Sequence, residues 1–278
     1  MLNTTVPRRH DATSYEPLRV VLLTTRRAPG LEDLLADPDR GLTWQLVAAV
    51  VTDPESPEIA RLDSARVPVL VRDLKIFTRA RGTRLDDLDA RRAFDADTVV
   101  QLAPFEPDLL VLCAYLHIAT APLLEAYPRR MINVHDADLA IIGPDGRPRY
   151  RGLHSTRDAV AAGEPETRST VHVVAAEVDV GPVLVRSWAF PVHGLLLDAR
   201  RWGAADIVKA YAYAQREWMM RAVWGSLLVE TIRLFATDGL RWLDGRPVIA
   251  GRLGPVTLDA PRSQGALDFH LAAAGGDR

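Results

Sequence analysis

The sequence predicts an α/β protein with a doubly wound, mostly parallel sheet and helices on both faces. Short apolar runs rich in β-branched residues, typical of strands covered on both sides, recur at 19–23, 46–51 and 108–113. Helix-like stretches separate several of these runs, and strands that alternate with helices favour parallel pairing through right-handed crossovers. With 278 residues, the chain is long enough to bury the core of one large domain.

The first half of the chain carries most of this alternation. A weaker strand is expected at 67–71 and a further strand at 131–135, with helices at 31–36, 57–65 and 122–127.

The pattern changes after residue 135. Segments 169–175 and 183–190 indicate two strands joined by an acidic turn, which leaves little room for a crossover helix. Apolar and aromatic residues at helical spacing predict a long helix over 204–236, and 242–247 a short strand and turn.

The polarity of the chain ends predicts where the folded domain lies. Residues 1–17 are polar and have no period, so we expect a flexible tail. Residues 18–250 form the expected domain. The Gly/Pro/Asp-rich segment 251–278 is expected to be loosely docked or disordered.

Composition narrows the function classes. A formal charge of −2 and a pI near 6.4 give no reason to expect nucleic-acid binding. The single cysteine, Cys113, cannot form an internal disulfide and follows an apolar run, so it is expected to be a small buried residue. No signal-peptide pattern and no membrane-spanning apolar run is present, which favours a soluble cytoplasmic protein without a membrane partner.

Three polar residues suggest chemistry. Asn133 and His135 project from the same face of the 131–135 strand, near its carboxyl end, where open α/β sheets place their sites. Asp179 lies in the later acidic turn. An amide can stabilise an oxyanion, an imidazole can move a proton, and a carboxylate can hold the imidazolium. Each residue taken singly has a simpler interpretation. Asn133 would cap a turn, and His135 would be a buried histidine whose hydrogen bonds are satisfied.

Several short motifs occur in the order typical of one family. They are Pro107-Asp108-Leu109-Leu110-Val111, Ala114-Tyr115-Leu116-His117-Ile118, Ile132-Asn133-Val134-His135, Tyr150-Arg151-Gly152-Leu153-His154, Ser169-Thr170-Val171-His172 and Val178-Asp179-Val180-Gly181-Pro182. In this order the chain resembles the folate-dependent formyltransferases, which include glycinamide ribonucleotide transformylase. The resemblance covers most of 18–247.

The resemblance implies a Rossmann-like formyltransferase fold and a site. Asn133, His135 and Asp179 would be catalytic. The backbone around Leu116, His117 and Ile118 and the loop with Val178, Val180 and Gly181 would hold the pterin of 10-formyltetrahydrofolate, the formyl donor. His117 stands where the family has a basic residue near the folate tail; a strand-end histidine half in water is the alternative. No metal is expected.

Two departures concern the formyl acceptor. The family's purine-pathway members have a Gly/Ser-rich phosphate loop after the first strand, but here Thr24 to Gly30 contains Pro29, Arg26 and Arg27. Either arginine could hold a carboxylate or phosphate, with surface solvation as the default interpretation. Glycinamide ribotide is therefore not the expected acceptor.

The second departure is a lengthened segment, 136–149, whose Gly-Pro-Asp-Gly signals predict a small hairpin or lid beside His135. Asp136, Asp138 and Gly152 are expected on the acceptor side. His135-Asp136-x-Asp138 lacks a second histidine at ligand spacing, which disfavours a metal site.

The favoured function is an N-formyltransferase that moves a formyl group from 10-formyltetrahydrofolate to a small amine. One alternative is a deformylase, which releases formate by hydrolysis; those relatives carry an N-terminal regulatory domain, for which the tail here is too short. Another is a catalytically weak folate- or nucleotide-binding module, against which the intact Asn133, His135 and Asp179 argue. The expected partners are folate and the amine, and a homodimer is left open.

Overall fold

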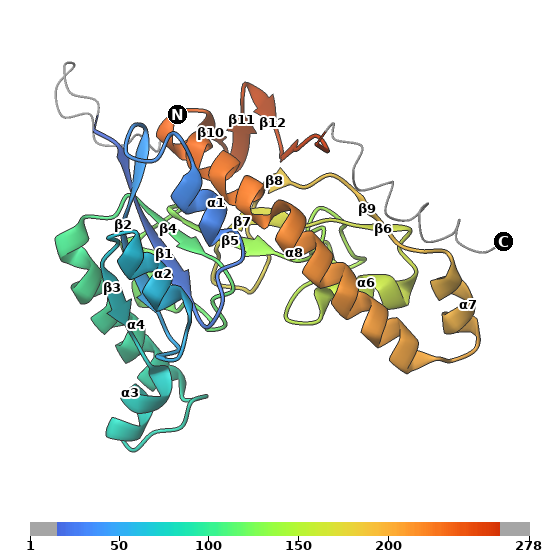
Figure 1. The fold of residues 1–278 in the computed structure, drawn as a ribbon, viewed down its shortest axis with the longest axis horizontal. Helices are drawn as coiled ribbons and strands as arrows, with labels where there is room; N and C mark the ends of the chain where they lie inside the picture. The colour runs from blue at the N-terminus through green and yellow to red at the C-terminus, as the bar shows by residue number, and fades with distance from the viewer. Residues whose placement is uncertain (1–15, 262–278) are drawn as a thin grey trace.

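The structure is a computed structural model that describes residues 16–261. An eight-stranded sheet crosses the molecule in the order β13-β8-β7-β5-β4-β1-β2-β3 (Figure 1). The neighbours from β5 to β3 pair in parallel, as do β13 and β8, whereas β7 runs antiparallel to both β5 and β8. The predicted α/β fold with a mostly parallel sheet is confirmed.

The strands of this sheet are short. They are β1 (Leu18–Thr24), β2 (Trp44–Val51), β3 (Val69–Val71), β4 (Leu109–Leu112), β5 (Met131–His135), β7 (Thr170–Val173), β8 (Val183–Arg186) and β13 (Val256–Thr257). Smaller sheets consist of β6 (Glu166–Thr167) with β9 (Phe190–Pro191), and of β10 (Leu240–Leu243), β11 (Arg246–Ile249) and β12 (Arg252–Leu253).

Eight α-helices occur in the described part of the chain. They are α1 (Leu31–Ala36), α2 (Glu58–Ser64), α3 (Leu74–Ala80), α4 (Leu88–Leu102), α5 (Ala121–Ala126), α6 (Ser155–Ala162), α7 (Leu195–Arg201) and α8 (Ala205–Ala236). The predicted helices at 31–36 and 204–236 match α1 and α8 closely. Within 16–261, no helix is long and apolar enough to cross a membrane.

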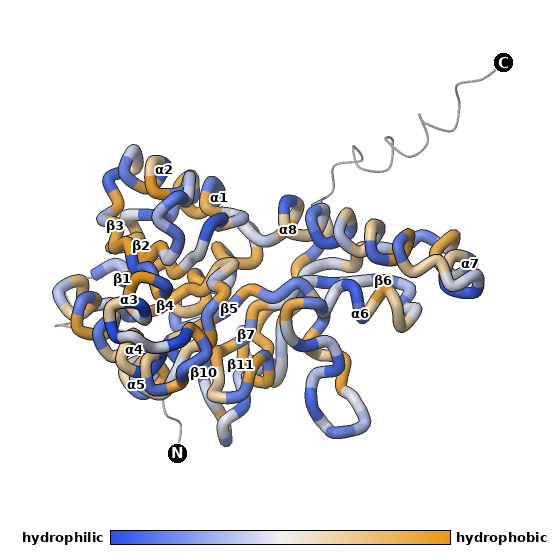
Figure 2. The backbone as a smooth tube through the Cα atoms, turned by 90° about the horizontal axis from the view of Figure 1, so that it is seen from below, coloured by the Kyte–Doolittle hydropathy of each residue, from blue (hydrophilic) through white to orange (hydrophobic). Residues whose placement is uncertain are grey.

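Helices cover both faces of the sheet, and successive side chains of β1 point alternately into the two hydrophobic cores that result. Val20 and Leu22 belong to one buried cluster, which includes α8 residues such as Leu227. Val21 and Leu23 belong to a second cluster, closed by residues of α4 and α5. Figure 2 shows the hydrophobic strands at the centre of the molecule.

Helices α3 and α4 occupy a stretch for which the hydrophobic pattern predicted no element. Charged residues separate the few apolar positions of α4, and even Asp95 on its inner face is buried. Its start is nevertheless encoded, since the Asp87 carboxylate accepts from the Asp89 and Ala90 backbone N–H groups, both at 2.9 Å.

Helices α1 and α8 cross at a contact that two glycines permit. A Cβ added to Gly30 would lie 2.6 Å from the Gly225 Cα, and Gly30 itself has φ +90°. A Cβ on Gly225 would lie 1.9 Å from an Asp33 carboxylate oxygen. This contact fixes the loop after β1 against the middle of α8 (Figure 1).

The region after α8 contains more structure than a single strand and turn. Strands β10 and β11 form a hairpin whose turn residues Asp244 and Gly245 both have positive φ. Strand β13, two residues long, joins the main sheet beside β8. The boundaries 1–17, 18–250 and 251–278 stay predictions, because residues 1–15 and 262–278 lie outside the described part.

Candidate active site

A cleft of about 430 Å³ opens where β4 and β5 end. His135 is the last residue of β5, and both Asn133 and His135 line the cleft. Asp179, on the turn between β7 and β8, lines it as well. The three residues predicted from the sequence therefore lie together, in a cleft at the carboxyl end of the parallel strand β5.

The antiparallel pairing of β5 with β7 brings a second histidine to the site. Asn133 lies opposite His172 in the register, and their Nδ2 and Nε2 atoms are 3.1 Å apart. The other ring nitrogen, Nδ1, is 3.0 Å from the Val173 carbonyl. One ring nitrogen of His172 therefore contacts the Asn133 amide while the other contacts a backbone carbonyl, and this arrangement holds the amide in place.

Asp179 joins the two imidazoles. Its Oδ2 lies 3.6 Å from His135 Nδ1 and its Oδ1 lies 3.5 Å from His172 Nε2. On the opposite side of the His135 ring, Nε2 is 3.1 Å from the Tyr150 carbonyl. Both nitrogens of His135 thus face oxygen acceptors, so a doubly protonated ring would be matched on both sides.

The Asp179 carboxylate is kept ionised. Burial would raise its pKa, but the hydrogen bond with His172, the charge of His135 and the Gly152 backbone N–H together lower that pKa to about 2. Gly152 donates to Asp179 at 2.7 Å. The Asp179 backbone has φ +57°, a conformation that aspartate tolerates better than most residues.

The mouth of the cleft is apolar. Leu116, Ile118 and Val178 line it with exposed fractions of 59, 49 and 43%. Val180 and Gly181 are not among the lining residues. Gly181 instead allows the turn to pack on β7, because a Cβ there would lie 1.7 Å from the Val173 carbonyl oxygen.

His117 also lines the cleft and ends a chain of hydrogen bonds. Its Nε2 is 3.1 Å from the Thr52 hydroxyl, Thr52 donates to the Thr25 hydroxyl at 3.0 Å, and the Leu116 backbone N–H donates to Thr25. Burial and then the nearby Arg91 charge lower the pKa of His117, which favours its neutral form. The Leu116 N–H is consequently already engaged.

The carboxylates expected on the acceptor side are paired with arginines. Asp136 is buried, accepts from Ser155 Oγ at 2.7 Å and pairs with Arg216 of α8. Asp138 pairs with Arg186 and does not line the cleft. The predicted hairpin is present, since Ile142 and Pro148 form an antiparallel bridge.

Arg26 and Arg27 lie outside the cleft lining. Arg26 pairs with Asp53 at 3.2 Å, and Arg27 pairs with Glu217 at 3.0 Å. Their exposed fractions are 59 and 54%, so these surface pairs tie the loop after β1 to its neighbours. Gly152, by contrast, lines the cleft.

The cleft residues that were not predicted from the sequence as site residues include His172, Arg216 and Trp224. His172 stood in a recognised motif, and its cross-strand position opposite Asn133 was the available signal. Arg216 and Trp224 lie on α8, where helical spacing indicates only which face is inward. Among residues 16–261, no group of three or more His, Cys, Asp or Glu could hold a metal ion.

The sequence profile of the formyl transferase family matches residues 18–194. The phosphoribosylglycinamide formyltransferase of Mycobacterium tuberculosis is 33% identical over 170 residues, which cover 61% of this chain and 70% of that protein. A methionyl-tRNA formyltransferase from Desulfotalea psychrophila is 30% identical over 176 residues, 63% of this chain and 48% of that protein. The chain spans 12% of the trifunctional purine biosynthetic protein adenosine-3 of Drosophila melanogaster, at 28% identity.

Solved structures share the fold. The phosphoribosylglycinamide formyltransferase of Coxiella burnetii aligns with a TM-score of 0.64 and 20% identity, covering 87% of this chain and 100% of that one. Glycinamide ribonucleotide transformylase 1 from Symbiobacterium toebii aligns with a TM-score of 0.61 and 24% identity, covering 84 and 94%. The family profile covers more than half of the sequence, and the chain belongs to the formyl transferase family.

Proposed function

We propose that this protein transfers a formyl group from 10-formyltetrahydrofolate to a small amine. The observation that carries the proposal is the group Asn133, His135, His172 and Asp179 in one cleft of a formyl transferase family member. The apolar mouth formed by Leu116, Ile118 and Val178 suits a flat heterocycle such as a pterin.

The reaction needs an oxyanion donor and a proton carrier. The acceptor nitrogen attacks the formyl carbon, the carbonyl electron pair moves to oxygen, and the bond from carbon to the folate nitrogen then breaks. The Asn133 amide is the donor for the oxyanion. His135 takes the proton from the attacking nitrogen and returns one to the leaving nitrogen, while Asp179, at 3.6 Å, stabilises the imidazolium.

His172 has a positioning role in this scheme. It lies between the Asn133 amide and the Asp179 carboxylate, and its ring is 2% exposed. It therefore orients both groups without needing to reach the substrate.

The test follows the formyl donor. The protein is incubated with 10-formyltetrahydrofolate alone and then with a panel of amines, and consumption of the donor is measured. Turnover that requires an amine supports transfer. Donor loss at the same rate without an amine would instead indicate the deformylase, and binding without turnover a folate-binding module.

The acceptor class remains a proposal of its own. The matched relatives include methionyl-tRNA formyltransferases, so the expectation that no nucleic acid takes part stays a prediction. A charged initiator tRNA therefore belongs in the panel.

A further inference from the structure

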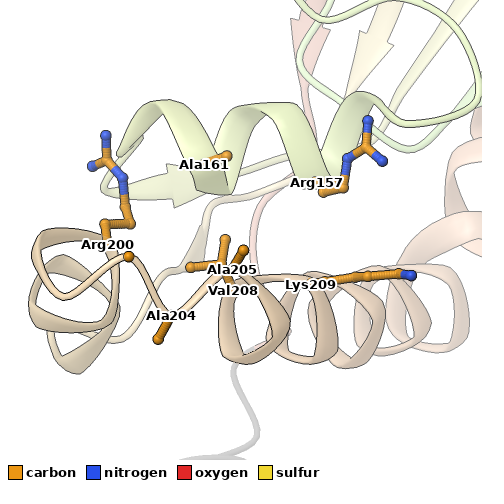
Figure 3. A pocket seen from close by; sticks show the side chains of 8 residues that line it. Arg157, Ala161, Arg200, Ala204, Ala205, Val208 and Lys209 are labelled. Atoms are coloured by element: carbon orange, nitrogen blue, oxygen red, sulfur yellow. The ribbon is translucent and has the colours of Figure 1, made fainter.

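A second cavity, of about 470 Å³, lies between α6, α7 and α8. Figure 3 shows Arg157 of α6 and Lys209 of α8 on the two sides of this space, and Arg200 of α7 at its other end. Val208, which is buried, and three alanines complete most of the lining. Three cationic side chains from three helices thus line an otherwise apolar space, one at one end and two at the other.

Two of these cations lack a partner. Within residues 16–261, the side chains of Arg200 and Lys209 make no ion pair or hydrogen bond, whereas Arg157 pairs with the exposed Asp158 at 3.1 Å. The nearest acidic neighbours along the helices, Asp158, Asp198 and Asp206, do not line the cavity, and Asp198 pairs with Arg201. Like charges gathered around a small space favour the binding of an anion.

The Arg200 side chain is placed by a close backbone contact. A Cβ added to Gly163, which ends α6 at φ +89°, would lie 2.0 Å from the Arg200 guanidinium. The guanidinium thus rests on the carboxyl end of α6, where a helix favours a cation. That contact holds Arg200 beside the cavity.

The cavity and the active-site cleft share the same helices. Lys209 lies seven positions before Arg216, which lines the cleft, so the two are about 10 Å apart and about two turns along the same side of α8. Helix α6 begins at Ser155, which donates to the cleft residue Asp136, and Arg157 follows two positions later. A ligand that lies along these helices can reach from the cavity to the cleft.

We propose that this cavity binds a phosphoryl group carried by the formyl acceptor, with its amine lying more than about 10 Å away, the spacing along α8. Arginine and lysine are the usual ligands of phosphate oxygens, and the small apolar walls leave room for the ester chain. The identification of the group as part of the acceptor rests on the proposed formyl transfer. The anion site itself does not.

Binding is tested on the full chain by calorimetry with inorganic pyrophosphate and no folate. Wild type should bind saturably, and the Arg200→Ala/Lys209→Ala double variant roughly tenfold or more weakly, through loss of charge-assisted contacts. The matched control is Arg201→Ala/Lys75→Ala, which removes the same charge from exposed positions outside the cavity and should bind as wild type. No saturable binding to wild type, or an equal loss in the control, overturns the anion site.

The source of the phosphoryl group is tested by turnover. Aminoalkyl phosphates of increasing chain length are compared with the matching amino alcohols, using 10-formyltetrahydrofolate. We expect the phosphates to have the higher kcat/KM once the chain spans the two sites, and the double variant to lose that advantage while keeping its rate with amino alcohols. Equal kcat/KM for phosphates and alcohols, with pyrophosphate binding intact, would show a free-anion site and overturn the link to the acceptor. Failure of every amine refutes formyl transfer but leaves the calorimetry valid.

Discussion

At the scale of single residues, the cleft is defined by four polar side chains that hold one another. Asn133 and His135 lie on a buried strand that ends at His135, and Asp179 reaches His135 from a separate turn. His172 completes the set by bonding the amide and facing the carboxylate. Because every member contacts another, removing one changes both the chemistry and the position of its neighbours.

His135→Ala should lower kcat/KM for formyl transfer by about two to four orders of magnitude, the range for a lost acid–base group. Asn133→Ala should cost about a hundredfold or more through the missing oxyanion donor. Steady-state assays measure both, and circular dichroism checks that each variant folds. Near-wild-type turnover by either folded variant would contradict the role proposed for that residue.

Asp179 should also make stability depend on acid. Its pKa is about 2 in the folded protein and about 4 when unfolded, so the folded state binds fewer protons in this range. The contribution, about 2 kcal/mol, is complete above pH 4 and is lost as the pH falls toward 2.

Urea denaturation between pH 2 and pH 7 measures this contribution. Asp179→Asn should be less stable than wild type at pH 7, with the difference shrinking as the pH falls. Asp63→Asn, a change at an exposed aspartate on α2, is the control. A difference between wild type and Asp179→Asn that stays constant with pH would contradict the linkage.

At the scale of elements, the glycines at the crossing of α1 and α8 set the position of the loop after β1. Gly30→Ala should destabilise the protein by about 1–3 kcal/mol more than Gly41→Ala, through steric overlap. The comparison is matched because Gly41 has nearly the same φ, +87°, but nothing within 4 Å of an added Cβ. Urea midpoints, read with their slopes, give the two losses. Equal losses of stability in the two variants would mean that the positive φ of Gly30, and not its contact with α8, determines the cost of the substitution.

Hydrophobic pattern explains which elements could be predicted. The strands β1, β2, β4 and β5 are buried on both faces, so their apolar runs are continuous and easily recognised. Helix α4 was missed because its inner face includes Asp95 and Thr98. The buried Asp95 carboxylate accepts hydrogen bonds from the Thr120 backbone N–H and hydroxyl, both at 2.6 Å. Only the tertiary structure reveals this partner.

The same limit applies to the site. Asn133 and His135 share a strand face, so the two-residue period of a strand was enough to predict that they lie close together. The pairing of Asp136 with Arg216 joins positions eighty residues apart in the sequence, and the contact of His172 with Asn133 depends on the register of an antiparallel pair. Long-range pairing and register follow from packing, which no local pattern encodes.

At the scale of the whole molecule, α8 orders the features that an acceptor would meet. The cationic cavity lies at its start, Arg216 enters the cleft further along, and Glu217 and Gly225 then hold the loop after β1. The cavity and that loop therefore lie on opposite sides of Arg216. An acceptor whose phosphate is bound in the cavity therefore enters the cleft from a different direction than an acceptor whose phosphate is bound at the loop after β1.

Glycinamide ribotide should consequently be a poor acceptor. In the loop after β1, Pro29 has no N–H, and the Ala28 N–H already donates to Glu58 at 3.3 Å, so neither residue can donate to a phosphate. Within the described residues, Arg26 and Arg27 are both ion-paired to acids. Steady-state assays should compare the ribotide with amino sugars, amino acids and aminoalkyl phosphates. A kcat/KM for the ribotide above about 10⁴ M⁻¹s⁻¹, within the ordinary enzymatic range, would contradict this and make purine synthesis the better assignment.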